Sequence, residues 1–264
     1  MAEKTGVYTA RKKDGSTYYR VSLTYRRKHI SLGSFPDPDT ASAVYTEGRS
    51  ALEHAETSLY DYSSAMNLPF DKFVILLNFR DNGIYFPNPI YLRNQYFEYY
   101  LSKDEILKFD RDDLFFYASH KIQKKGGYLF VSDYGSQYSI LSRYHIHPFA
   151  VYGRDYQMAN NDRLDYRYSN IRIINNYIGV QQEISDTGKS VYHTKIHVRG
   201  DYNVGTYDSE IEAAVAYNKA VDQLQKNGFQ KAYAKNYIVS MNKSQYESVY
   251  NTVSISKKLT TLVP

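Results

Sequence analysis

Tyr19-Arg-Val-Ser-Leu-Thr-Tyr25 begins the stretch that decides the fold, which continues through Arg-Arg-Lys to His29-Ile-Ser-Leu-Gly-Ser-Phe35. A second version lies near the C-terminus and reads Tyr192-His-Thr-Lys-Ile-His-Val198, Arg-Gly-Asp, Tyr202-Asn-Val-Gly-Thr-Tyr207. In each version a tyrosine, Tyr45 or Tyr217, follows twelve residues after the glycine. Self-similarity of this kind indicates two copies of one structural unit.

Each copy alternates between apolar and polar residues, which is typical of a strand with one buried and one exposed face. The inward positions are Val21, Leu23 and Tyr25 in the first copy and Thr194, Ile196 and Val198 in the second. A charged turn leads to another strand, and a helix is expected to follow. Ser209-Glu-Ile-Glu212 has the spacing of a capping box, and Pro36-Asp-Pro-Asp-Thr40 is expected to open the first helix. Each end therefore predicts a small sheet backed by one helix.

The outward face of each predicted sheet carries basic and hydroxyl side chains. A short ribbon of this kind fits the major groove of DNA, where arginine pairs with guanine edges while lysine, serine and threonine hold phosphates. The candidate DNA contacts are Arg20, Ser22, Thr24, Arg26, Arg27, His193, Lys195, His197 and Arg199. The alternative is that these side chains only form a solvated surface.

The pattern Tyr-x-Val-x-Leu, Ile-x-Leu-Gly-x-Phe and Ala-x-x-x-Tyr resembles AP2-type DNA-binding domains. The similarity covers about residues 5–57 and 186–240, and the second copy, which closes with Lys235-Asn-Tyr-Ile238, is the better match. The resemblance implies a three-stranded antiparallel sheet packed on one helix, with the sheet contacting duplex DNA. Both copies lack the tryptophan often found on that sheet.

Within the middle of the chain, residues 161–172 resemble the core of HNH homing endonucleases, which commonly carry AP2-type domains. In that family an aspartate that helps hold a metal and a histidine that acts as general base precede this stretch. These two positions fall on Gln157, a poor substitute for a metal-binding carboxylate, and on Met158, which cannot take a proton. Asn170 matches the central asparagine, and the third position, on a following helix, falls near Gly179. The resemblance implies a nuclease scaffold without its catalytic groups.

A relocated catalytic site is the main alternative. His145 and His147 are two residues apart in a predicted strand, so they would share a face and could bind a metal with Asp155 or Asp162. The weak catalytic candidates are therefore His145, His147 and Asn170. No cofactor or metal is expected, and Mg²⁺ enters only if the chain is a nuclease.

Other segments of the middle region give simpler predictions. Residues 90–101 predict a helix, and residues 110–117 a strand or its entrance. Residues 121–127 predict a basic loop, and residues 128–132 a strand. Most of this region is expected to be scaffold.

Charge and composition restrict the class of protein. The 264 residues carry a net charge of +5 and contain no cysteine, which excludes disulfides and cysteine-ligated zinc. The chain shows no apolar signal segment and no run long enough to span a bilayer, so a cytoplasmic location is expected, nucleoid-associated if the source is bacterial. The expected partner is double-stranded DNA, with no membrane and with a homodimer left open.

Together these features predict an α+β protein with two small AP2-like units flanking a mixed α+β middle domain. The expected parts are an AP2-like module over 1–57, a non-catalytic HNH-like domain over 58–185, an AP2-like module over 186–240 and a tail over 241–264. We expect a sequence-preferring DNA-binding protein that regulates transcription and derives from an HNH/AP2 homing endonuclease. The alternatives are an active metal-dependent endonuclease, a protein-interaction module and an RNA-binding protein.

Overall fold

The computed structural model describes residues 5–264 and confirms the α+β class, with several small three-stranded antiparallel sheets. The chain divides into two compact units. The first holds the residues up to Gln123 together with Leu164–Ser169. The second holds Lys124–Arg163 and Asn170–Pro264. The expected middle domain, residues 58–185, is thus shared between the two units.

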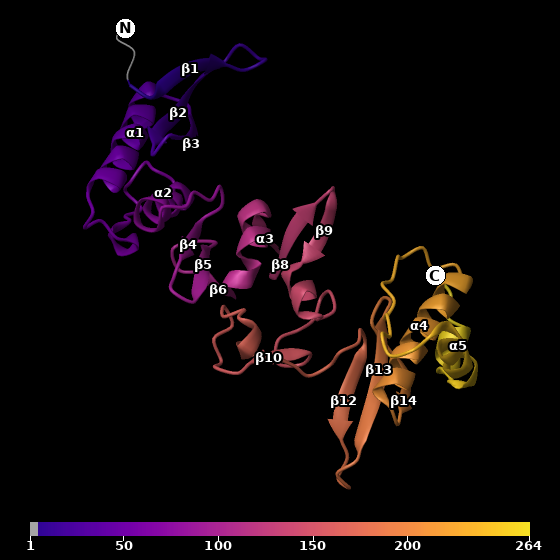
Figure 1. Cartoon of the computed structure of the whole chain (residues 1–264). Helices are drawn as coiled ribbons and strands as arrows, with labels where there is room; N and C mark the ends of the chain where they lie inside the picture. The colour runs from indigo at the N-terminus through magenta and orange to yellow at the C-terminus, as the bar shows by residue number, and fades with distance from the viewer. Residues whose placement is uncertain (1–4) are drawn as a thin grey trace. The chain divides into compact units, whose positions relative to one another are not determined.

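The first unit begins with an antiparallel sheet of β1 (Val7–Arg11), β2 (Thr17–Tyr25) and β3 (Lys28–Phe35). Helix α1 (Pro38–Glu53) lies along one face of this sheet (Figure 1). Asp37 caps the helix by accepting from the N–H groups of Asp39 and Thr40, and Pro38 begins it. The expected inward residues Val21 and Leu23 are 1% and 3% exposed, so the sheet-and-helix prediction is confirmed.

The remainder of the first unit extends the core behind this sheet, through Leu68, Phe73 and Leu77, and adds a cluster of aromatic side chains. Its elements are η1 (Leu59–Asp61), α2 (Phe70–Asn82), β4 (Ile90–Leu92), β5 (Tyr96–Tyr100), β6 (Ile106–Asp110), η2 (Arg111–Asp113) and α3 (Leu114–Ser119). The ring of Phe97 stacks on Phe109 at 5.4 Å between centroids.

Two predictions for this region are wrong. Residues 90–101 form the β4–β5 hairpin and not a helix. The sequence did not indicate a strand here, because β5 is buried on both faces and therefore lacks the alternation of apolar and polar residues. Residues 114–119 form α3 and not a strand. The acidic side chains just before it, Asp112 and Asp113, favour the start of a helix through its dipole.

The second unit begins with small elements. They are β7 (Ile122–Lys125), β8 (Tyr128–Asp133), β9 (Ser136–Ser139), η3 (Ile140–Tyr144), β10 (Tyr156–Met158), η4 (Tyr168–Asn170) and β11 (Ile171–Ile173). The boundary between the two units falls within β7 and again within η4. The predicted strand at 128–132 is confirmed. The predicted basic loop is wrong for 122–125, because the turn is confined to Gly126 and Gly127, both of which have positive φ.

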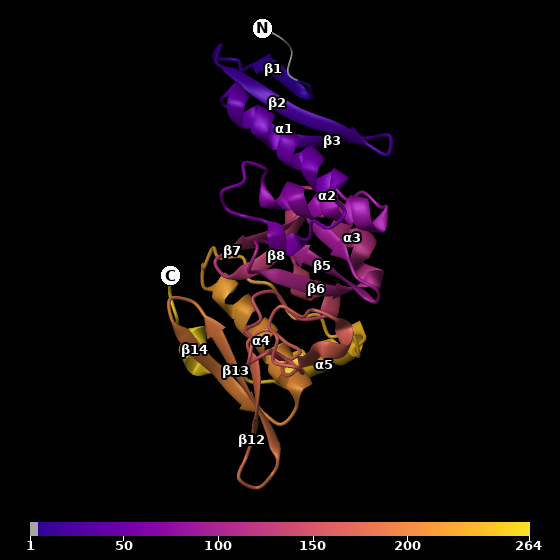
Figure 2. The same cartoon turned by 90° about the vertical axis from the view of Figure 1, so that its left-hand side faces the viewer.

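The C-terminal sheet of the second unit consists of β12 (Val180–Ile184), β13 (Ser190–His197) and β14 (Asp201–Tyr207). Helix α4 (Glu210–Lys226) packs against this sheet (Figure 2). Ser209 caps the helix, and its hydroxyl accepts from the N–H of Glu212. Strand β12 lies before residue 186, where the second module was expected to begin.

Residues 241–264, which were expected to form a tail, are part of the hydrophobic core formed by the C-terminal sheet and α4. It contains α5 (Lys243–Thr252) and α6 (Lys257–Thr260), and both helices contact α4. Val253 and Leu259 are 8% and 0% exposed within the cluster that holds the alanines of α4. Tyr207 donates to the carbonyl of Ser254, and Ser256 N–H donates to the carbonyl of Val204. The C-terminal sheet and these helices therefore fold as one body.

The two modules repeat each other in backbone detail. Each sheet has a register shift in its middle strand, between Val21 and Ser22 in one and between Thr194 and Lys195 in the other. Ser22 N–H donates to the carbonyl of Gly6, and in the same way Lys195 N–H donates to that of Gly179. The repeat seen in the sequence is thus a structural repeat. Among the described residues 5–264, no helix has both the length and the apolar character needed to cross a membrane.

Candidate nucleic-acid interface

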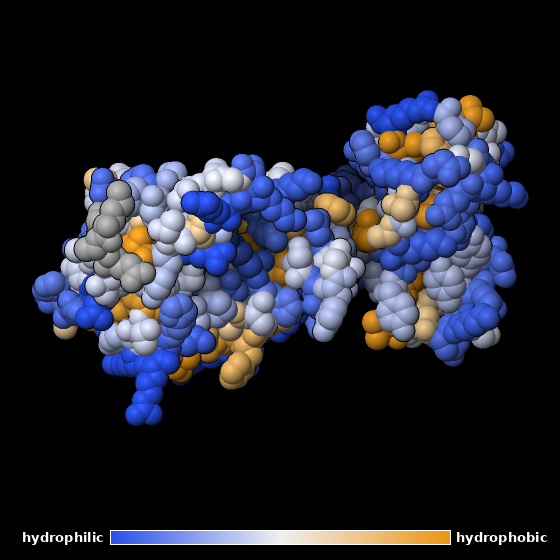
Figure 3. Space-filling view, turned by 90° about the horizontal axis from the view of Figure 1, so that it is seen from above, coloured by the Kyte–Doolittle hydropathy of each residue, from blue (hydrophilic) through white to orange (hydrophobic). Residues whose placement is uncertain are grey.

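The outward face of the N-terminal sheet forms an acid-free surface. Tyr8, Arg20 and Ser34 align across its three strands, and Thr24 lies opposite His29. The sequences of β1, β2 and β3 contain no aspartate or glutamate. Basic, hydroxyl and aromatic side chains therefore meet on this face without a carboxylate of the sheet to neutralise them. Figure 3 shows that hydrophilic residues, in blue, cover much of the surface seen from above, with smaller hydrophobic patches between them.

Arg20 is held in place at the centre of this face. Its Nη2 donates to the hydroxyl of Tyr18 at 2.7 Å, and the guanidinium lies 5.5 Å from the centre of the same ring. Tyr8 beside it is 56% exposed. A guanidinium fixed by a neighbouring ring but open to solvent is well placed to bind an anionic or planar group.

Three of the residues expected on this face are placed elsewhere. Ser22 is only 7% exposed and lies at the register shift of the middle strand, between the buried residues Val21 and Leu23. Arg26 and Arg27 form the β2–β3 turn with φ of 45° and 64°. Arg26 Nη1 reaches the carbonyl of Phe79 at 3.3 Å, near the C-terminal end of α2, so this side chain is engaged in the fold. Arg27 and Thr24 are exposed.

The C-terminal sheet has a mixed outward face. His193 Nε2 lies 3.0 Å from Glu183, and His197 Nδ1 lies 2.8 Å from Asp201. Lys195 and Arg199 are exposed as expected. Because two of the four expected contacts face carboxylates, this sheet presents a weaker positive field than the N-terminal one.

The HNH-like segment forms the β10–β11 hairpin, in which Gln157 lies opposite Arg172 and Met158 opposite Ile171. Gln157 is exposed, whereas Met158 is 2% exposed. Asn170 is buried, and its Oδ1 accepts from the N–H of Asn160 at 2.9 Å, which braces the loop between the strands. Residues 174–179 contain no helix, so the helix expected to carry the third position is absent from this stretch.

The two histidines proposed as a relocated site do not lie in a strand. His145 is exposed with φ of 58° at the end of η3, so the predicted strand is wrong here. His147 Nδ1 lies 3.0 Å from the carbonyl of Pro148, and its Nε2 lies 3.9 Å from Asp155 Oδ2.

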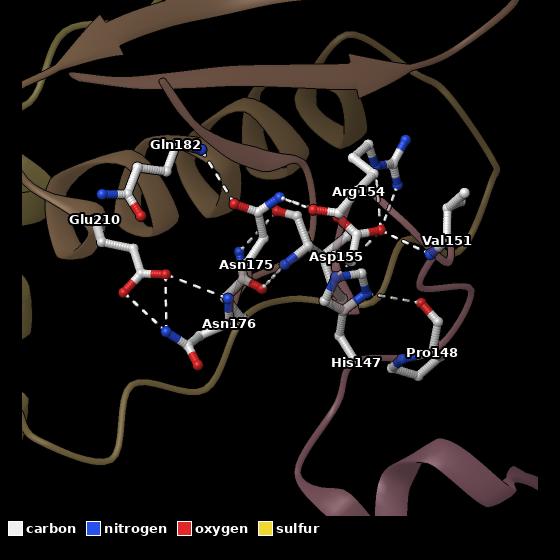
Figure 4. A network of polar contacts seen from close by, with 11 residues as sticks. His147, Pro148, Val151, Arg154, Asp155, Asn175, Asn176, Gln182 and Glu210 are labelled. Carbon is white, nitrogen blue, oxygen red and sulfur yellow. Dashed lines mark hydrogen bonds and ion pairs between the residues drawn. The ribbon is translucent and has the colours of Figure 1, made fainter. Parts of the chain in front are cut away.

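Asp155 is the centre of a buried polar network (Figure 4). Its Oδ2 accepts from the N–H of Val151 at 2.8 Å and from Arg154 Nη2 at 2.7 Å. Burial by itself raises the pKa of this carboxyl, but the hydrogen bonds from Arg154 and Val151 outweigh it and hold the pKa below its ordinary value. Asn175 joins the network by donating to the carbonyl of Arg154 and accepting from the N–H of Gln182.

This network links separate chain segments. Within the part of the chain that the structure describes, no three histidine, aspartate or glutamate side chains converge as a metal site. Asp162 lies in the β10–β11 loop, where its N–H donates to Asn160. Asp155 and Asn175 instead connect the 147–155 loop to the start of the C-terminal sheet.

Sequence reasoning missed several residues of the acid-free surface, namely Tyr8, Tyr18, His29, Ser31 and Ser34. The alternation in β1 and β3 contains the signal that places them on the same face as Arg20. A comparison of the chain with protein-family models, curated proteins and solved structures found no match. The AP2 and HNH resemblances therefore stay predictions.

Proposed function

We propose that the protein is a sequence-preferring double-stranded-DNA-binding protein that acts as a transcriptional regulator. The observation that carries this proposal is the acid-free outward face of the N-terminal sheet, with Arg20 fixed at its centre by Tyr18. Phosphates attract such a face over a distance of about 10 Å, and arginine can then read guanine in the major groove.

The second copy supports this function as an auxiliary site. Lys195 and Arg199 are its exposed cations, while its histidines face carboxylates. When one of two linked sites has bound DNA, the other site is held at a high effective concentration near the same DNA. A modest contact by the C-terminal module can therefore still add to affinity. We expect the N-terminal module to dominate binding and the C-terminal module to extend the recognised sequence.

The test begins with selection of bound sequences from random duplex DNA, followed by anisotropy titrations of the enriched duplex. Arg20→Ala is expected to weaken binding about tenfold and to reduce the salt slope by about one. Arg49→Ala is the matched control, because it removes the same charge from α1 on the other side of the module. Equal affinities for these two variants would contradict the proposed face.

The same preparation separates the alternative functions. Incubation of the protein and the duplex with Mg²⁺ or Mn²⁺ is expected to leave the duplex uncut. Cleavage that disappears in a His145/His147 double variant would instead support the nuclease hypothesis. A stable oligomer without nucleic-acid affinity would favour the interaction module. Tighter binding to an RNA of matched sequence than to the DNA duplex would favour the RNA-binding hypothesis, since the grooves of RNA and DNA helices differ in shape.

A further inference from the structure

A cavity of about 460 Å³ lies within the second unit, beside the outward face of the C-terminal sheet. Its walls come from the 147–155 loop, the start of β12, strand β13 and residues 231–234. A volume of this size is in the range of small-molecule sites. The aromatic rings of Phe149, Tyr217 and Tyr233 supply part of the lining.

The lining has a positive excess. Asp155 is bonded to Arg154, and Asp201 to His197, so both carboxylates of the lining are already paired. Lys195 and Lys231 add two further cations from separate segments. Lys231 Nζ donates only to the carbonyl of His197, at 3.2 Å, and lies over the ring of Tyr233. These two ammonium groups have no carboxylate partner among the described residues.

Two lining residues also contain buried polar atoms that lack a hydrogen-bond partner within the described residues. They are Nε2 of His147 and the hydroxyl of Tyr233. A buried polar atom without a partner is destabilising and uncommon in folded proteins. Because both belong to the lining of one cavity, the partner that they lack is best supplied by a molecule outside the chain.

We propose that this cavity binds a phosphate group. Phosphate oxygens accept from several donors at once, which matches two lysines and a tyrosine hydroxyl around a space that also offers aromatic rings. Because Nδ1 of His147 donates to the carbonyl of Pro148, its Nε2 can accept from the P–OH group of a hydrogen phosphate. The phosphate has two chemical sources, a free nucleotide or the backbone of bound DNA. The second source rests on the proposed function, whereas the first is independent of it.

The test is calorimetric titration of the full chain with inorganic phosphate, with each of the four nucleoside 5′-monophosphates, and with the enriched duplex. A Lys195→Ala/Lys231→Ala variant is expected to lose affinity at least tenfold for the source that fills the cavity. Lys243→Ala, which removes a highly exposed lysine on α5, is expected to change nothing. A Tyr233→Phe variant keeps the ring and tests the hydroxyl alone.

The outcomes separate this proposal from the proposed function. Nucleotide binding that survives Arg20→Ala but is lost in the double-lysine variant identifies a free nucleotide as the ligand. Duplex binding weakened by Lys231→Ala, without competition from nucleotides, identifies the DNA backbone. If no phosphate compound binds, or if every affinity is the same in the double-lysine variant, the cavity proposal is wrong even where Arg20→Ala still weakens duplex binding.

Discussion

Gly179 lies so close to Tyr217 that a Cβ atom built on the glycine would be 2.5 Å from a carbon of the tyrosine ring. Gly6 has the same relation to Tyr45, at 2.1 Å. Both glycines have φ near +75° and accept a hydrogen bond from the middle strand of their sheet. The two copies therefore share a glycine–tyrosine contact that joins the first strand to the helix behind it.

Replacing either glycine by alanine should destabilise its module. The new methyl group would meet the tyrosine ring and a backbone carbonyl, and the backbone would remain in the left-handed region. We expect a loss of about 3 kcal/mol in the free energy of unfolding for Gly6→Ala and for Gly179→Ala. Chemical denaturation followed by circular dichroism measures this.

Gly15 and Gly188 provide the matched controls. Both have positive φ, but a Cβ atom at either position would have no neighbour within 4 Å. Their alanine variants should lose only about 1 kcal/mol, the cost of the backbone conformation. Equal losses in all four variants would mean that the close contact with tyrosine does not contribute.

Arg26 and Arg27 share one turn, but we expect Arg26 to contribute to stability and Arg27 to DNA binding. Arg26→Ala removes the hydrogen bond to the carbonyl of Phe79 and should lower stability by about 1 kcal/mol without a specific effect on DNA affinity. Arg27→Ala should leave stability within about 0.5 kcal/mol and weaken DNA binding. Thermal unfolding and anisotropy titration of both variants check this, and a reversed pattern would refute the assignment.

Asp155 should make the second unit sensitive to acid. Its folded-state pKa is lowered, so its contribution to stability is present above the unfolded-state pKa of about 3.9 and is lost as pH falls through the folded-state value. Asp155→Asn should cost about 3 kcal/mol at neutral pH, because it leaves partners of a buried carboxylate unpaired. It should also flatten the decline of stability below about pH 4. Denaturant titrations across this range measure both effects.

Tyrosine ionisation should destabilise the protein in alkali. Burial raises the pKa of Tyr99, Tyr207 and Tyr217 to about 12. A raised pKa means that their contribution to stability is complete below about pH 10 and is lost as pH rises toward 12. Ultraviolet titration should show a late-ionising class of tyrosines that merges with the others once the chain is unfolded. A single early transition in the folded protein would contradict this.

Lys219 should hold the C-terminal helices onto the second unit. Its Nζ donates to the carbonyls of Tyr250 and Val253, at 2.7 and 2.8 Å, at the end of α5. Lys219→Met keeps most of the aliphatic stem but removes both bonds, and should cost about 2 kcal/mol. Lys226→Met, at the exposed end of α4, should cost less than about 0.5 kcal/mol. Hydrogen exchange should show that only the first variant loosens α5.

The sequence by itself determined the two adjacent strands and the following helix of each module. Period-two alternation assigned Val21, Leu23 and Ile196 to the core, and local capping signals placed the starts of α1 and α4. These features depend on neighbouring residues, so they can be read from a short stretch of chain. The aromatic strand β5 could not be read in this way, because burial on both faces removes the alternation.

Only the tertiary structure decided which outward residues are free to bind. Ser22 is covered, Arg26 is bonded to α2 from a position 53 residues away in sequence, and His193 faces Glu183 on a neighbouring strand. The cavity likewise combines residues from six separate segments. Alternation assigns a side chain to a face of the sheet, but what lies over that face depends on contacts between residues that are distant in the chain.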